Sequence, residues 1–290
     1  MRAMAALLLL AVATPASADP PAEMVQIGGG EPVTIRADRA YILFRRVRPE
    51  GVTGIEPIFM RVPTAAEMER YREARRAAFA RAQPELLRRY QRRLQRDPQR
   101  AGTPPSEATF PFEFDEIANT HNIEDDPALE GGRPESVHLV EVLPGDYVLY
   151  GANFGSGFLV DALYACMCLG TVGFSVRPGE VTDLGYFMAD LASDQTPIPE
   201  LQSEAGLGRG ATGLATPIVA TMRPPNARTQ APRQLSGARV VAVEYRAVGK
   251  FFDPRAGSIN RLVPVPGVLD YEGGRVIHVR TGQEAQGGHY

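Results

Sequence analysis

Proline and glycine interrupt this chain so often that they limit the folds open to it. The 290 residues include 29 Gly and 25 Pro, and between them lie short runs rich in β-branched and aromatic residues. Such runs, bounded by turn residues, are typical of strands of about four to eight residues. Many short strands joined by Pro-Gly turns favour an all-β sandwich over an α/β sheet. We therefore predict a mainly β protein with a β-sandwich.

Two Pro-Gly sequences are predicted to close hairpins. Residues 137–143 would turn at Pro144-Gly145 and return as 147–150, and residues 174–176 would turn at Pro178-Gly179 and return as 181–187. A proline followed by glycine suits a type II turn, in which the glycine takes a positive φ. Further strands are expected at residues 33–35, 41–44, 58–60, 218–219, 240–245 and 276–279.

One stretch has a different periodicity. Between residues 65 and 96 the apolar residues recur mostly three or four apart, and strong helix formers fill the other positions. Thr64 and Glu67 have the spacing of a capping box, which marks a helix start. Pro84 is expected to kink or split the helix. The predicted fold is thus a β-sandwich with one long Arg-rich α-helix inserted between its strands.

The predicted helix is strongly basic although the chain is not. Residues 64–100 hold eleven Arg and five acidic residues, whereas the whole chain has a net charge of −3. One interpretation is an amphipathic arm that contacts an anionic surface, such as lipid, with Arg88, Arg89, Arg92 and Arg93 as the contacts. The interpretation we favour from sequence is that the helix pairs with the acidic residues that follow it. The slightly negative total charge gives no indication of nucleic-acid binding.

Residues 1–18 have the three parts of a cleavable signal peptide. Arg2 is the positive end, residues 5–13 are apolar, and residues 16–18 are small. The apolar run is shorter than the roughly 20 residues that span a bilayer, and no later stretch is long and apolar enough. No cysteine precedes Cys166 to carry a lipid anchor. With 30 Arg and one Lys, a bias typical of GC-rich coding, we expect a bacterial protein that is periplasmic or secreted, with no transmembrane segment after signal removal.

Cys166 and Cys168 are the only cysteines. In a strand their positions share a face and lie about 6.6 Å apart, at the outer edge of what a disulfide tolerates. A strained local disulfide, two buried thiols and an intermolecular bridge all stay open. With His138 or His278 the pair could supply ligands to a metal. A periplasmic redox or metal-binding protein is therefore the alternative function, although a structural pair is the simpler interpretation.

Two other patterns point to sites less directly. Ser156 stands between two glycines, but the G-x-S-x-G pattern of a hydrolase is missing, so we favour a turn and keep a hydrolase as an alternative. His121, Glu124, Asp125 and Asp126 could offer ligands to a hard cation, but their spacing fits no calcium loop. We predict no catalytic residue, no bound metal and no cofactor.

A resemblance supports the fold and the compartment. The sequences LPGDYVLY at 143–150, CMCLG at 166–170 and FSVRPGE at 174–180, with Leu184-Gly185 after them, resemble the core of small β-sandwich domains in uncharacterised bacterial envelope proteins and lipoproteins. The match covers roughly residues 136–187 and brings no catalytic residues with it. This chain departs from the lipoproteins because it lacks the cysteine that they acylate.

These observations divide the chain and suggest a function. We expect an exported envelope protein, a non-enzymatic binding or structural β-sandwich whose partner is an unknown envelope component or an anionic surface. The expected segments are a signal peptide (1–18), N-terminal sandwich strands (19–63), the Arg-rich helix (64–100), an acidic connection (101–135), the sandwich core (136–189), a Pro/Gly-rich loop or linker (190–236), C-terminal strands (237–281) and a mobile tail (282–290).

Overall fold

The structure is a computed structural model of the full chain. It describes residues 23–30, 32–47, 55–114, 116–132, 135–154, 163–166, 171–191, 218–248, 251–253, 257–259, 269–272 and 275–284. The predicted signal peptide, Ser156 and Cys168 lie outside these residues. None of the helices in the described ranges is long and apolar enough to cross a membrane.

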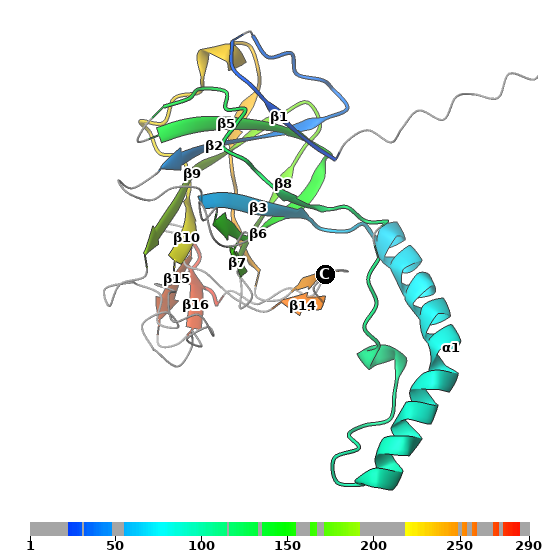
Figure 1. The fold of residues 1–290 in the computed structure, drawn as a ribbon. Coiled ribbons are helices and arrows are strands. Elements are labelled where there is room, and N and C mark those ends of the chain that lie inside the picture. The colour runs from blue at the N-terminus through cyan, green and yellow to red at the C-terminus, as the bar shows by residue number, and fades with distance from the viewer. Residues whose placement is uncertain are drawn as a thin grey trace, which may run out of the picture.

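Two six-stranded sheets form the body of the protein, as the sequence predicts (Figure 1). The first sheet contains β1 (Met24–Ile27), β5 (Glu135–Val142), β2 (Ala40–Val47), β9 (Val181–Leu191), β10 (Ile218–Arg223) and, beside β9, β11 (Val240–Ala242). The second contains β12 (Arg246–Val248), β8 (Thr171–Val176), β6 (Gly145–Phe154), β3 (Ile55–Arg61), β4 (Thr120–Asn122) and, beside β6, β7 (Leu163–Cys166). Two small hairpins follow, β13 (Phe251–Asp253) with β14 (Gly257–Ile259) and β15 (Leu269–Glu272) with β16 (Arg275–His278).

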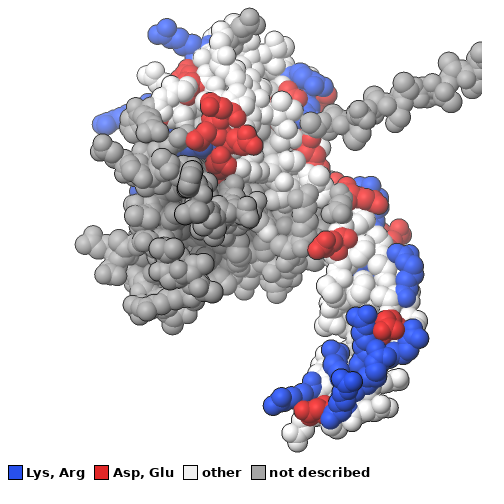
Figure 2. All heavy atoms as spheres, viewed as in Figure 1, with Lys and Arg blue, Asp and Glu red and all other residues white. Residues whose placement is uncertain are grey.

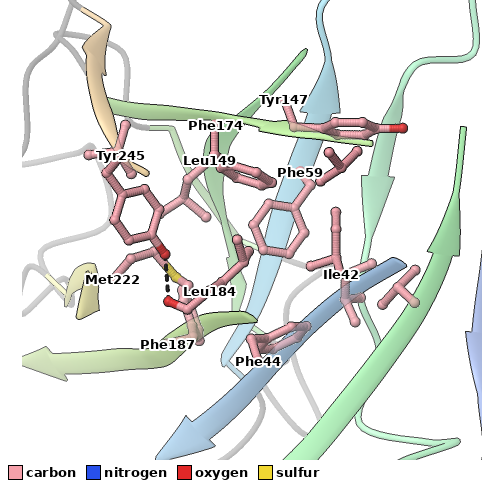
Figure 3. Packing of buried hydrophobic residues seen from close by; sticks show 14 of the residues in the cluster. Ile42, Phe44, Phe59, Tyr147, Leu149, Phe174, Leu184, Phe187, Met222 and Tyr245 are labelled. Atoms are coloured by element: carbon pink, nitrogen blue, oxygen red, sulfur yellow. Dashed lines mark hydrogen bonds between the residues drawn. The ribbon is translucent and has the colours of Figure 1, made fainter. Parts of the chain in front are cut away.

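Aromatic side chains join the two sheets across the core (Figure 3). The ring of Phe59 on β3 lies edge-on to Phe44 of β2, with centroids 5.8 Å apart, and edge-on to Phe174 of β8 at 5.9 Å. Edge-to-face pairs at this spacing add to the free energy gained by burial. The Tyr245 hydroxyl, buried beside them, donates to the carbonyl oxygen of Leu184 at 2.6 Å. The sheets therefore share one hydrophobic core, as a sandwich does.

Both predicted hairpins are wrong in the same way. β5 pairs with β1 and β2 in the first sheet, whereas β6 pairs with β3, β7 and β8 in the second. β8 and β9 are likewise in different sheets. Pro178-Gly179 forms a turn, with a φ of 71° at Gly179, whereas Gly145 already begins β6; both Pro-Gly sequences carry the chain from one sheet to the other. Because Gly145 pairs with Val176, the two crossings lie side by side.

The predicted strand at residues 33–35 is also corrected. These residues form no strand; Val33 and Ile35 pack on the outer face of β2, beside Tyr41 and Leu43. The Val33 N–H donates to the Gln234 carbonyl at 3.0 Å, so its backbone is satisfied without a sheet. β2 is consequently buried on both faces, and its apolar run from Ala40 to Phe44 reflects that.

The long helix α1 (Ala65–Arg96) is inserted between β3 and β4, as predicted. It runs through Pro84 without a break, so the expected split does not occur, although the ribbon bows along its length (Figure 1). At about 1.5 Å per residue, 32 residues extend roughly 48 Å. Residues 97–119, which include the short helix η1 (Glu107–Thr109), return beside it. We call residues 64–119 the arm; it projects from the sandwich.

Candidate functional site

The base of the arm is fixed to the sandwich by Arg61, the last residue of β3. Its guanidinium donates to both carboxylate oxygens of Glu67, at 3.0 and 2.7 Å, and to Glu23 at 2.8 Å. Glu67 also accepts from the Thr64 N–H at 2.7 Å, while the Thr64 hydroxyl accepts from the Glu67 N–H at 3.2 Å. This is the capping box that the sequence predicts. One carboxylate thus begins α1 and ties it to β3.

The electrostatics of this base favour the ionised carboxylates. The hydrogen bond from Arg61 lowers the pKa of Glu67 to about 2, against a smaller opposing effect of burial. Burial raises the pKa of Glu23, but hydrogen bonds from His121 and Arg61 outweigh it and the net shift is downward. Arg61 is only 5% exposed, so solvent screens this network weakly. The arm is therefore anchored by charge as well as by chain connectivity.

The proximal half of the arm has a small aromatic core. Tyr71, 4% exposed, contacts Phe112 and Phe114 with ring centroids 5.8 Å away in both cases, and Ile117 is buried in the same cluster. Farther out, Phe79 lies edge-on to Phe110. Arg75 donates to the carbonyl oxygens of Ala108 and Phe110 at 2.9 and 3.2 Å. The returning chain is thus held on one face of α1 mainly by aromatic packing.

The distal half carries most of the charge. Residues 81–100 contain seven Arg and only two acidic residues, whereas residues 64–80 contain four Arg and three Glu. Figure 2 shows the basic side chains gathered toward the free end of the arm, away from the sandwich. We call residues 81–100 the tip of the arm. The tip is a cationic surface that the body of the protein does not cover on this face.

The four arginines singled out from sequence are brought together there. Arg88, Arg89 and Arg92 all pair with the single carboxylate of Glu85, at 3.1, 3.1 and 3.5 Å, with each guanidinium side chain 59–66% exposed. Arg93 forms no ion pair within the described chain. The Arg89 hydrogen bond lowers the pKa of Glu85. One negative charge among four positive ones leaves the tip with a clear excess of positive charge.

The expected pairing with the acidic connection is not what the described residues show. The ion pairs of Arg72, Arg88, Arg89, Arg92 and Arg100 all go to acidic residues within 64–100. In the described parts of 107–135, Asp125 instead pairs with the buried Arg46 of β2. Within the described residues, therefore, no arginine between residues 81 and 100 forms an ion pair with residues 107–135.

Two leucines interrupt this polar surface. Leu87 and Leu94 are 37% and 41% exposed, and they are among the four large apolar residues that are exposed in the described chain. They lie two turns apart on α1 and so share one side of the helix. Leu94 belongs to the apolar periodicity that predicts the helix, yet the structure leaves it exposed.

The other candidate residues are separated by the fold. Cys166 ends β7 in the second sheet, and its partner Cys168 is outside the described residues. His138 is fully buried in β5 of the first sheet, stacked on Phe44 and hydrogen-bonded to Ser136 at 2.9 Å. It is a core residue. Its ring packs inside the sandwich and is not exposed to solvent.

Two of the four residues considered for a cation, His121 and Asp125, are engaged elsewhere. His121 pairs with Glu23 at 3.2 Å, and Asp125 pairs with Arg46. No group of three or more His, Cys, Asp and Glu side chains in the described ranges is arranged to hold a metal ion.

A cavity of about 740 Å³ opens where the second crossing between the sheets meets β11, β12 and the chain after β16. Arginines line it, but Arg239 pairs with Glu180 at 2.6 Å and Arg246 pairs with Asp146 at 3.2 Å. The lining thus offers charge of both signs. The cavity is not predictable from local sequence because its walls come from three segments, around residues 175–182, 239–246 and 278–283.

Comparisons with protein-family models, with curated proteins and with solved structures give no match to this chain.

Proposed function

We propose that this chain is an exported, non-enzymatic binding protein of the bacterial envelope, in which a β-sandwich presents a basic arm to an anionic partner. The observation that carries the proposal is the position of Arg88, Arg89, Arg92 and Arg93 at the free end of an anchored arm, with one carboxylate between them. Exposed arginines with so little internal compensation attract polyanions, and the attraction weakens with salt.

The base of the arm supports the same proposal. The Arg61–Glu67 pair and the Tyr71 cluster hold α1 in one direction before any partner binds. A binding group that is already ordered loses less conformational entropy on association than a flexible one. The arrangement therefore suits a contact at a distance from the sandwich, about the length of the helix away.

The binding step is tested on phosphocellulose, a polyanionic matrix. Replacing Arg88, Arg89, Arg92 and Arg93 with Gln is expected to lower the salt concentration of elution substantially. The matched control replaces four exposed arginines of the sandwich, Arg177, Arg223, Arg228 and Arg233, with Gln, which changes the net charge equally. The control is expected to elute near the wild type. Equal losses in the two variants would show that net charge, and not the arm, controls binding.

Export is tested separately. Expression in a Gram-negative host followed by N-terminal sequencing is expected to find a mature chain that starts near Asp19 in the periplasmic fraction. A chain that keeps Met1 and stays in the cytoplasm would overturn the envelope assignment while leaving the binding test intact.

A further inference from the structure

The distal half of α1 carries two different stripes. Arg81, Arg88, Arg92 and Arg96 recur seven or four residues apart and form one stripe, with Arg89 and Arg93 about 100° to one side of it. Leu87 and Leu94, seven residues apart, form the other stripe, on the opposite side of the first. At 3.6 residues per turn the midpoints of the two stripes lie roughly 150° apart around the helix axis. The returning chain occupies a third side, the one that includes Phe79. The leucine side and the arginine side are therefore both presented outward.

We propose that the anionic partner of the arm is a lipid surface, with Leu87 and Leu94 entering the acyl boundary and the arginines contacting lipid phosphates. This inference rests on the proposed function, because it names the partner of the same arm. A helix with an apolar side and an arginine-rich side lies along a bilayer interface, where both sides find partners at once. The long arginine side chains extend to the headgroups while their methylenes stay near the apolar region.

The leucines favour lipid over other anions. A polyanion in water, such as an acidic polysaccharide, would bind the arginines and leave Leu87 and Leu94 in water. Both leucines stay more than a third exposed in the folded chain, so the fold itself does not use them. An anionic bilayer supplies the charge and the apolar layer together. The position of the tip, far from the sandwich, lets it reach such a surface without contact by the body of the protein (Figure 2).

The chain contains no tryptophan, which permits a direct test. Leu94→Trp introduces a single fluorophore at the tip, and Val25→Trp introduces one at an exposed position of β1 as the control. Each variant of the mature chain is mixed with phosphatidylglycerol vesicles or phosphatidylcholine vesicles. Leu94→Trp is expected to shift its emission to the blue with phosphatidylglycerol only, and brominated acyl chains are expected to quench it. Val25→Trp is expected to show neither effect.

A second variant tests the leucines themselves. Leu87→Gln with Leu94→Gln alters two exposed positions, so the fold should be retained, which circular dichroism verifies. The apparent affinity for phosphatidylglycerol vesicles, measured by sedimentation, is expected to fall about tenfold. The salt concentration of elution from phosphocellulose is expected to stay that of the wild type. This pattern would separate the apolar contribution from the charge contribution.

The outcomes distinguish the two proposals. Retention on phosphocellulose through the arm, with no vesicle binding, would overturn the lipid inference and leave the proposed function standing. Vesicle binding without a blue shift at Leu94→Trp would also overturn it, because the leucines would then stay in water. A native mass spectrum that shows an arm-dependent dimer, with no vesicle binding, would assign the tip to a second copy instead. If the arm variant and the sandwich variant lost equal retention on phosphocellulose, the proposed function would be overturned.

Discussion

Arg61 and Glu67 face each other across the junction of β3 and α1, with two parallel hydrogen bonds of 3.0 and 2.7 Å between guanidinium and carboxylate. Such two-point pairs have fixed geometry and are stronger than single hydrogen bonds. Since Arg61 is buried and also binds Glu23, it contributes strongly to holding the arm in one direction. Four predictions follow from this junction and from comparable contacts.

Arg61→Gln is expected to lower the free energy of unfolding by about 2–3 kcal/mol, because it leaves the carboxylates of Glu23 and Glu67 without their cation. Chemical denaturation followed by circular dichroism measures the loss. The control is Arg72→Gln, which removes an exposed pair with Glu69 and is expected to cost less than about 0.5 kcal/mol. Similar costs for both variants would show that the junction does not hold the arm.

Stability is expected to fall in acid through Glu67. Its pKa is about 2 in the folded chain and near its ordinary value of 4.5 when unfolded, so folding favours the ionised form. The contribution is complete above about pH 4.5 and is lost as the pH falls toward 2. Thermal melts from pH 6 to 2 should therefore show a smaller decline for Glu67→Gln than for the wild type. If the melting temperatures of the two proteins declined in parallel with pH, Glu67 would not be a source of the acid sensitivity.

Asp183→Asn is expected to destabilise the first sheet by about 3 kcal/mol or more. Arg45 on β2 donates to Asp183 on β9 at 2.7 Å, and the side chains are only 4% and 8% exposed. The substitution leaves a buried guanidinium without its counter-ion. Asp38→Asn is the control, since Asp38 is 68% exposed and pairs with Arg36 on the surface. Urea midpoints measure both, and a negligible change at Asp183 would rule out a structural role for the pair.

Tyr71→Ala is expected to release the returning chain from α1. The ring supports Phe112 and Phe114, so removing it opens a cavity at the proximal half of the arm. Hydrogen exchange in residues 110–117 should accelerate at least tenfold, while β2 and β9 keep their protection. Tyr90→Ala removes the same atoms at a half-buried distal position and should affect 110–117 much less. Equal acceleration throughout the sandwich would mean that the arm does not fold as a separate unit.

Local signals predicted the helix closely. The period between residues 65 and 96 and the Thr64–Glu67 spacing depend only on neighbours within a few turns, and α1 begins and ends where they indicate. The mainly β composition was predictable for the same reason. The distribution of arginine along the helix also followed from sequence, because on an exposed helix each side chain keeps the face that its position assigns.

Partners across the chain were not predictable. Both Pro-Gly sequences indicate turns; Pro178-Gly179 forms one, and Pro144 lies at a bend directly before β6. Whether such a site closes a hairpin or connects two sheets depends on which distant strand is adjacent. On β2, Ile42 pairs with β5 on one side and with β9 on the other, at residues about 100 and 140 positions away in the sequence. No local pattern encodes this order of strands.

The helix, the chain reversals and the concentration of positive charge were all readable from local sequence, because propensity, capping and composition act over a few residues. The three-dimensional fold was needed to see that Arg88, Arg89 and Arg92 pair within α1 and not with the acidic connection. It was also needed to see that Leu87 and Leu94 stay exposed. The reason is physical: ion pairs and burial depend on which surfaces meet, and aromatic packing at Tyr71, not charge, brings the returning chain to one side of the helix.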